Sequence, residues 1–197
     1  MKSRILGASV TARSTVIAVI ILSLAANGYL LFQYRRAQVN RMEAVAALAK
    51  DIPGYLGMAE SYLESTLAGG IKSYAFFSRA DPYLLAAANG TRLLQHLDKE
   101  HERVWFDIQV ALDEARAAIS FDKLGLSPEW DSLTPGASDR IKAVSDLAAE
   151  VKKAFAEISI GQHPRVAFDL ALLRASDDAA LRFLDLEFED EPLTYNP

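Results

Sequence analysis

The chain has 197 residues, no cysteine and a net charge of −5 at pH 7. The absence of cysteine excludes disulfides, thiolate catalysis and cysteine-based zinc sites. Residues 1–50 carry seven Lys/Arg and one Glu, whereas residues 51–197 carry fourteen Lys/Arg and twenty-five Asp/Glu. An acidic distal part without a basic stripe repels phosphate backbones, so we expect no nucleic-acid partner.

An uncharged apolar run occupies residues 16–32, between Arg13 and the pair Arg35 and Arg36. With its uncharged neighbours it covers residues 15–34, about the 20 residues that a helix needs to cross a bilayer. The sequence therefore predicts a single transmembrane signal anchor at residues 15–34. The three arginines are its predicted membrane-interface anchors, since their long side chains can reach the headgroups.

The length and the flanking charges of this segment bear on its cleavage and on its orientation in the membrane. Small residues at positions 23–25 would suit a signal peptidase, but the run continues beyond the roughly 7 to 15 apolar residues of a cleaved signal. Flanking charges are nearly balanced, although a short basic segment at residues 1–14 before an apolar run is typical of an export signal. We expect a single-pass plasma-membrane protein whose C-terminal domain is extracytoplasmic. Its predicted partners are the lipid bilayer and another envelope or membrane protein, and no oligomeric state is predicted.

Beyond the anchor, apolar residues recur every three or four positions, which is the spacing of helices rather than strands. Residues 35–54 are predicted to extend the anchor helix as far as a kink or break at Pro53, since proline removes a backbone donor and clashes with the preceding turn. Residues 55–191 are predicted to form a helical bundle domain. Residues 192–197 are expected to fray.

The bundle domain is predicted to contain four helices, each with one apolar seam. They are expected at residues 56–77, 82–121, 138–160 and 164–188. Asp81 and Ser138 are the predicted N-caps, and Gly69 and Gly70 weaken or bend the first helix. The predicted fold is all-α, with an N-terminal single transmembrane helix followed by an antiparallel, up-down four-helix bundle.

Two polar residues fall on the predicted apolar seams: His101 on the second bundle helix and Asp177 on the fourth. A buried histidine requires a hydrogen-bond partner and can change its charge near neutral pH. We expect His101 to bond to a backbone carbonyl or to Asp177, as a polar site in the core. A ligand-binding or pH-switch role for the two residues is the alternative.

Metal-binding and catalytic motifs are absent from the sequence. His96 and Glu100 share a helix face, but His101 follows His96 by five residues and points elsewhere, so neither a metal nor a cofactor is predicted. The chain has no nucleophile elbow, no glycine-rich phosphate loop and no His-Glu-x-x-His motif. The sequence therefore predicts no enzymatic activity.

The leading hypothesis is a membrane-anchored, non-catalytic interaction or scaffolding module. The alternative is a sensory or small-ligand-binding ectodomain that works with a second membrane protein. A filled core beneath an exposed apolar patch would favour the first, whereas an internal pocket with convergent polar groups would favour the second.

Overall fold

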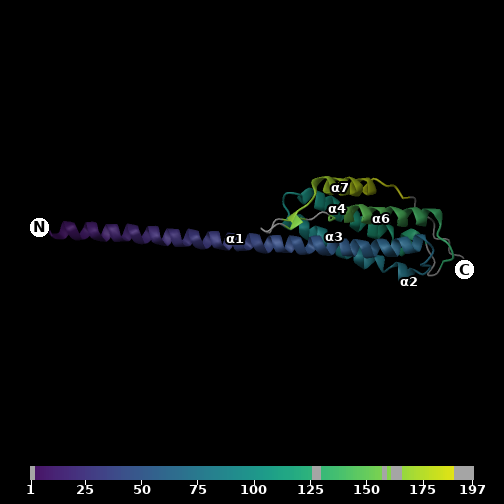
Figure 1. Ribbon diagram of the computed structural model, residues 1–197, viewed down its shortest axis with the longest axis horizontal. Coiled ribbons are helices and arrows are strands. Elements are labelled where there is room, and N and C mark those ends of the chain that lie inside the picture. Colours follow the sequence, from purple (N-terminus) through teal and green to yellow (C-terminus); the bar gives the residue numbers. More distant parts are fainter. Residues whose placement is uncertain (1–2, 126–129, 157–158, 161–165, 189–197) are drawn as a thin grey trace. The chain divides into compact units, whose positions relative to one another are not determined.

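The computed structural model is mainly helical (Figure 1). The helices are α1 (Ser3–Leu67), α2 (Tyr74–Phe77), α3 (Ala80–Leu97), α4 (Glu102–Ala118), α5 (Phe121–Leu124), α6 (Pro135–Lys153) and α7 (Leu170–Leu184). Strands β1 (Ser159–Ile160) and β2 (Val166–Ala167) pair antiparallel. The structure describes residues 3–125, 130–156, 159–160 and 166–188, with the backbone alone for residues 3–16, 18, 121, 159 and 160. The predicted all-α class is confirmed, since the ladder is only two residues long.

The chain divides into two compact units, Met1–Arg41 and Met42–Pro197, and α1 contributes residues to both. Among the described residues, no helix has a stretch that is both long enough and apolar enough to span a membrane. The anchor expected at residues 15–34 lies partly outside that set, because the side chains of residues 15, 16 and 18 are not described. The anchor therefore stays a prediction.

The helix break predicted at Pro53 is wrong, because α1 continues through this residue to Leu67. Ile52 and Leu56 on either side of Pro53 are fully buried. The packing of this face of α1 stabilises the helix by more than the missing backbone donor of Pro53 destabilises it. Burial commonly outweighs local helix preference in this way.

The helix predicted over residues 56–77 ends instead at Leu67, and a separate short helix, α2, follows. Gly69 has φ +75°, the left-handed conformation that glycine adopts without a steric penalty. The Ser65 carbonyl accepts hydrogen bonds from the N–H groups of Gly70 at 2.8 Å and Ile71 at 3.2 Å. The glycine pair therefore terminates the helix rather than weakening its middle.

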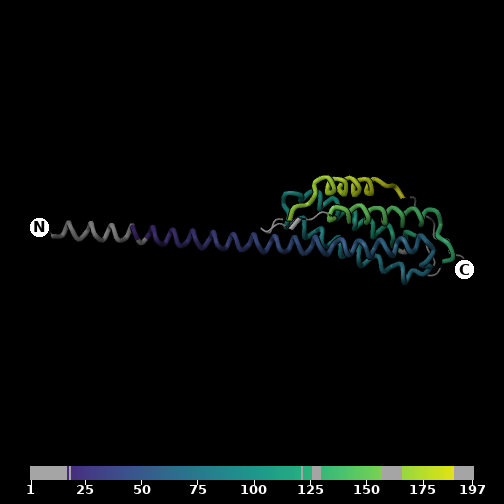
Figure 2. Tube along the Cα trace, in the orientation of Figure 1, coloured from purple at the N-terminus to yellow at the C-terminus, as the bar shows by residue number. Residues whose placement is uncertain are grey.

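The single helix predicted over residues 82–121 is also wrong, because α3 and α4 are separated by residues 98–101 (Figure 2). Asp98 leaves helical geometry with φ −106° and ψ 82°. The predicted N-cap Asp81 lies inside the first turn of α3, and its carboxylate pairs with Arg116 of α4 at 2.8 Å. The chain therefore forms two helices joined by a four-residue connection instead of one long helix, and the apolar faces of α3 and α4 pack on each other.

Gly90 marks the closest approach between α3 and the distal part of α1. A Cβ added at Gly90 would lie 2.7 Å from Cγ1 and 3.0 Å from Cδ1 of Ile52. No side chain fits there without displacement, and α3 continues through Gly90 without a break. The residue is required for helix packing.

The boundaries of α6 and α7 differ from those predicted. Thr134, not Ser138, caps α6: its side-chain oxygen accepts from the N–H of Ala137 at 3.2 Å, and Pro135 occupies the first turn. Asp169 caps α7 through the N–H groups of Ala171 at 2.8 Å and Leu172 at 3.0 Å. The predicted start of the last helix at Pro164 is wrong, since Val166 and Ala167 are extended. Residues 161–165 and 192–197 lie outside the described residues.

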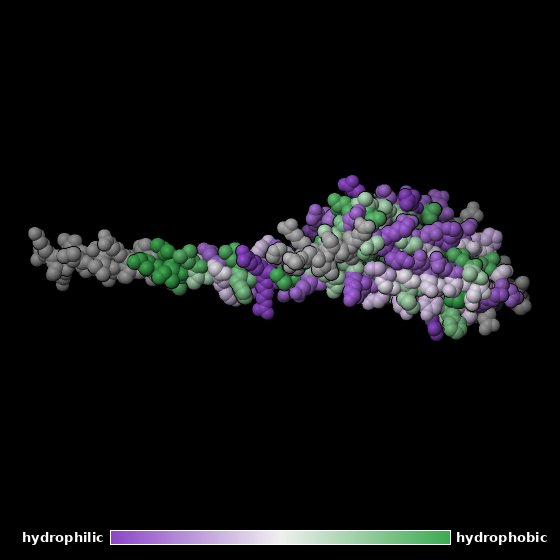
Figure 3. Space-filling view, in the orientation of Figure 1, coloured by the Kyte–Doolittle hydropathy of each residue, from purple (hydrophilic) through white to green (hydrophobic). Residues whose placement is uncertain are grey.

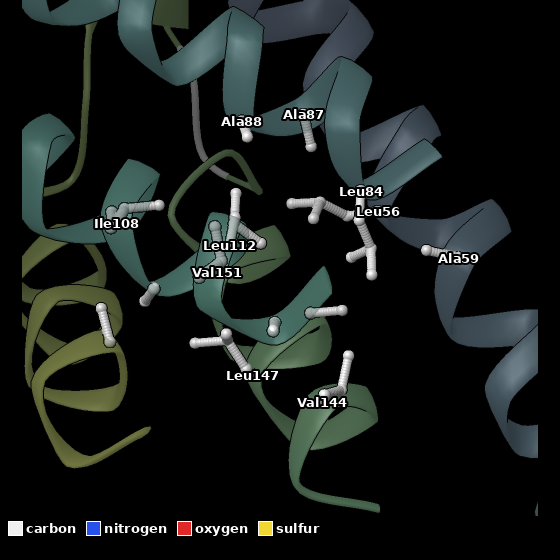
Figure 4. Close-up of a cluster of buried hydrophobic side chains, with 14 of the residues drawn as sticks. Leu56, Ala59, Leu84, Ala87, Ala88, Ile108, Leu112, Val144, Leu147 and Val151 are labelled. Atoms are coloured by element: carbon white, nitrogen blue, oxygen red, sulfur yellow. The ribbon is translucent and has the colours of Figure 1, made fainter. Parts of the chain in front are cut away.

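The second unit has one apolar core (Figure 4). Its fully buried side chains include Leu56 of α1, Leu84 of α3, Leu112 of α4 and Val151 of α6. Five helical segments longer than ten residues build the described part of this unit, namely residues 42–67 of α1 with α3, α4, α6 and α7. The count exceeds the four expected, because the predicted second helix is divided in two.

Candidate functional site

The connection between α3 and α4 carries the first candidate site. Asp98 Oδ2 lies 2.9 Å from His101 Nδ1 and accepts a hydrogen bond of 2.9 Å from Trp105 Nε1. The side chains of Asp98 and His101 are only 15% and 17% exposed. The Asp98 carboxylate therefore holds in place both the connection between α3 and α4 and Trp105, the first buried side chain of α4.

Aromatic rings pack around the two residues that contact this carboxylate, Trp105 and His101. Trp105 is fully buried, stacks on Phe155 with 5.6 Å between ring centroids, and meets Phe168 edge-on at 4.9 Å. His101 also meets Phe168 edge-on, at 6.4 Å. The cluster joins α4 to the end of α6 and to the residue that follows β2, and each ring pair adds about 0.5 to 1.5 kcal/mol beyond burial alone.

The chemistry available to this site is limited. A His–Asp pair can act in acid–base catalysis when the histidine also contacts a nucleophile or substrate group. Among the described residues, the imidazole of His101 has no hydrogen-bond partner other than Asp98, and the nearby Lys99 pairs with Glu102 at 3.0 Å. The described residues also contain no group of three or more potential ligands arranged to hold a metal ion. The pair of Asp98 and His101 is best explained by a structural role in the connection between α3 and α4.

Asp177, the second predicted site residue, faces α4 from the middle of α7. Its Oδ1 atom is buried and has no hydrogen-bond partner among the described residues. Burial raises the pKa of Asp177, the charges of Asp107 and Asp178 raise it further, and Arg103 opposes them. The structure thus holds a carboxyl group where its charged form is unfavourable.

The predicted contact between His101 and Asp177 is wrong. His101 precedes the first residue of α4 and bonds to Asp98, three residues earlier. Helical spacing predicts a seam of the last helix through Leu170, Leu173, Asp177, Leu181 and Leu184, and of these only Leu173 is buried, while Leu170, Leu181 and Leu184 are exposed. The other buried side chains of α7 are Ser176, Ala179, Ala180 and Phe183. Asp177 lies at the edge of that face instead of its centre.

The three predicted interface arginines belong to the first unit. The side chain of Arg13 lies outside the described residues, and Arg35 and Arg36 are exposed on α1. Nothing within the described chain places them against a membrane, so this role also stays a prediction.

A surface that the sequence did not single out lies on α3. Its outward side carries Pro82, Leu85, Asn89 and Leu93, all exposed and all without charge. We call these four residues the outer face of α3. Leu93 is 52% exposed, and the spacing of three and four residues repeats the pattern of a buried seam, with Asn89 as its one polar member. α3 therefore has an apolar inner face in the core and an uncharged, largely apolar face towards solvent.

Four cavities lined by described residues of the second unit are clefts open at the surface. The largest of these has about 740 Å³ and is lined by residues 70–73, Phe76, Trp130 and Asp131. Another, of about 470 Å³, lies among α4, α6 and the end of α7, next to Arg140 and Phe183. None of the four is an internal pocket of the kind expected for an enclosed small ligand.

No family model, curated protein or solved structure matches this chain. The functional interpretation therefore depends on the surfaces and side chains themselves.

Asp98, Trp105 and Asp107 are the site residues that sequence reasoning missed. The polar run at residues 98–100 is typical of a solvated helix face, and Asp98 belongs to it. The sequence does contain one signal for this site: a polar run between two apolar patterns can also indicate a connection between two helices. An aspartate in such a connection can accept hydrogen bonds from residues that follow it. Asp107 and Asp177 are seventy residues apart, and only the packing of α7 on α4 brings their charges together.

Proposed function

We propose that the chain is a membrane-anchored, non-catalytic interaction module whose helical bundle works outside the cytoplasm. The observation that carries the proposal is the apolar segment of α1, which is exposed on every side. Its large side chains between Ile17 and Tyr34 are 52–69% exposed (Figure 3). Consecutive residues such as those at 19–22 are all exposed, and each step turns by about 100° around the helix, so no side of this segment is polar.

A lipid environment accounts for this surface better than water does. The largest apolar patch on a soluble monomer is typically about 300–600 Å² and covers one face only. A helix that is apolar all round is either buried in a large core or inserted in a membrane. The described residues of Met1–Arg41 include no second helix that could bury it. The pair Arg35 and Arg36 then supports an interface position at the end of the segment.

The interaction role is supported by the outer face of α3. The domain is strongly acidic, yet this face has no charge between Pro82 and Leu93 other than Arg92 at its border. Its helical spacing suits an apolar helix of another protein held in the same membrane, which would bury Pro82, Leu85 and Leu93 in a seam. The amide of Asn89 would then need a hydrogen-bond partner on that helix, and a single polar residue in such a seam fixes register and partner choice.

The alternative function, a ligand-sensing ectodomain, requires a pocket that encloses its ligand. The four clefts described above are open at the surface, which favours interaction through a surface. A partner-binding bundle needs no internal cavity.

The anchor is tested by alkaline carbonate extraction of membranes that contain the full chain. We expect the protein to stay in the membrane pellet, and release of most of it would contradict the anchor. The orientation is tested with Ser61→Cys, since the chain has no other cysteine and the new thiol lies on the exposed side of α1. A membrane-impermeant maleimide should label it from outside the inner membrane, whereas labelling only after the membrane is opened would reverse the topology.

The interaction surface is tested by a photo-crosslinking residue at Leu93 in the full chain, with the same residue at Asp146, an exposed position of α6, as the control. We expect a discrete crosslinked species from position 93 that Leu85→Glu removes. Equal crosslinking from both positions, or from neither, would contradict a role for the outer face of α3.

A further inference from the structure

Helix α7 packs on the rest of the bundle through one side of the helix. It packs on α4 and α6 and is the last helix of the described chain (Figure 1). Leu173, Ala180 and Phe183 form its buried apolar side, and Ser176 Oγ donates to the Glu150 carbonyl of α6 at 2.9 Å. These contacts keep α7 docked.

Asp177 opposes this docking when it is charged. Its Oδ1 atom is buried without a partner among the described residues, although the rest of the contact is apolar or hydrogen-bonded. The acidic groups that repel its charge are Asp107 on α4 and Asp178 on α7 itself. Arg103 compensates weakly, since its side chain is 91% exposed and lies 3.7 Å from Asp107. A negative charge at this position loses water and gains no complete ion pair.

Among the described residues of the other elements that pack on α7, no Lys, Arg or His forms an ion pair with Asp177. On α6, Asp146 pairs with Lys142, and Glu150 pairs with Lys153 at 2.6 Å. Near β2, His101 is held by Asp98 at 2.9 Å. The groups that face Asp177 are therefore mainly acidic or already paired.

We propose that α7 is an acid-stabilised helix: protonation of Asp177 tightens its packing on α4 and α6, and loss of that proton loosens it. A neutral carboxyl group has no charge to desolvate and feels no repulsion from Asp107 and Asp178, whereas the carboxylate is subject to both effects. The pKa of Asp177 in the folded protein is raised from 3.8, its unfolded reference. The stabilisation is therefore complete below about pH 3.8 and is lost as the pH rises through the higher folded value. Loosening of α7 exposes its apolar side and the surface of α4 and α6 on which it packs.

This inference does not depend on the membrane anchor, since every group it uses belongs to the second unit. The proposed topology adds only that the bundle would experience the pH outside the cytoplasm.

The test is amide hydrogen exchange, followed by mass spectrometry, on the full chain in detergent micelles between about pH 4.5 and pH 7.5. Exchange in α7 is divided by exchange in α6 at each pH, which cancels the intrinsic effect of pH on amide chemistry. We expect the relative protection of α7 to rise on acidification in the wild-type chain. In Asp177→Asn it should be at least about fivefold higher than wild type at pH 7.5, and nearly independent of pH, because the substitution removes the charge of a carboxylate whose Oδ1 atom is buried without a partner among the described residues.

The matched control is Asp131→Asn, which removes one negative charge at an exposed position outside α7. It should behave like the wild-type chain, whereas Asp107→Asn should give a smaller shift in the same direction as Asp177→Asn. The proposal is overturned if the relative protection of α7 is unaffected by pH in the wild-type chain. It is equally overturned if Asp131→Asn reproduces the effect of Asp177→Asn, because net charge alone would then explain the result.

Discussion

Two parts of the same helix, α1, differ in how they satisfy their apolar side chains. In residues 42–67 apolar side chains recur on one side, where Val45, Ile52 and Leu63 are buried at no more than 4% exposure. In the first unit, the described side chains of residues 17 and 19–34 are exposed on all sides of the helix, and no side of this segment is polar. The helical backbone is common to both parts, so hydrogen bonding does not distinguish them. The distal part thus buries its apolar side chains within the second unit, whereas the exposure of the proximal part is the observation behind the proposed membrane anchor.

The largest effect is expected from charges in the proximal part. The double substitution Ile20→Arg and Leu24→Arg should abolish retention of the full chain in carbonate-washed membranes, since each arginine in a membrane helix costs about 2.5–3.5 kcal/mol. The matched control places the same charges at the exposed distal residues Tyr55 and Met58, where retention should not change. Retention of the Ile20/Leu24 variant would show that the apolar segment is not the anchor.

Charges in the buried distal part should break the bundle instead. Leu56→Asp and Val151→Asp each introduce an unpaired charge at a fully buried position, so we expect losses of about 3–5 kcal/mol in the free energy of unfolding. Denaturant unfolding followed by circular dichroism measures the loss, and membrane retention should be unaffected. A loss below about 1 kcal/mol, similar to that of Met58→Asp, would mean that the core is not packed as described.

A smaller effect distinguishes close helix packing from helix preference. Gly90→Ala should destabilise the bundle by about 1–3 kcal/mol, because its Cβ would overlap the Ile52 side chain. Gly54→Ala would place its Cβ in open space and should instead add up to about 1 kcal/mol through better helix preference. Equal effects of the two substitutions, measured by chemical denaturation, would contradict the α1–α3 contact.

The smallest expected change is at Asp177. Asp177→Asn should raise the free energy of unfolding by about 1 kcal/mol at neutral pH, because it removes the charge of a partly buried carboxylate whose Oδ1 atom has no hydrogen-bond partner among the described residues. The folded pKa is raised, so the difference from wild type should shrink as the pH falls towards 3.8. Denaturation midpoints across this range measure it, and a difference that grows on acidification would show that the sign is wrong.

The sequence predicted the inward faces of several helices well. The spacing of three and four residues predicts inward positions at Ala49 and Leu63 of distal α1 and at Ile141 and Val144 of α6, and all four side chains are buried. These faces follow directly from helical periodicity, which depends on the residues of one helix alone.

The sequence did not predict where helices end or which polar groups meet. Residues 94–118 continue the helical spacing across the break at Asp98, so periodicity alone cannot separate α3 from α4. Pro53 has the opposite outcome, because burial of its neighbours keeps the helix intact. The partner of His101 and the neighbours of Asp177 depend on tertiary packing, for which one sequence contains no direct signal.

The most direct test of the difference within α1 uses single nitroxide labels, which the cysteine-free sequence allows without further substitution. Leu24→Cys and Ser61→Cys would be labelled in the full chain reconstituted in lipid vesicles, and collisions with oxygen and with a water-soluble nickel chelate would be measured by electron paramagnetic resonance. We expect the label at position 24 to collide with oxygen and to be shielded from the chelate, and the label at position 61 to show the reverse. A label at position 24 that the chelate reaches as readily as the label at position 61 would place this segment in water and contradict the proposed anchor.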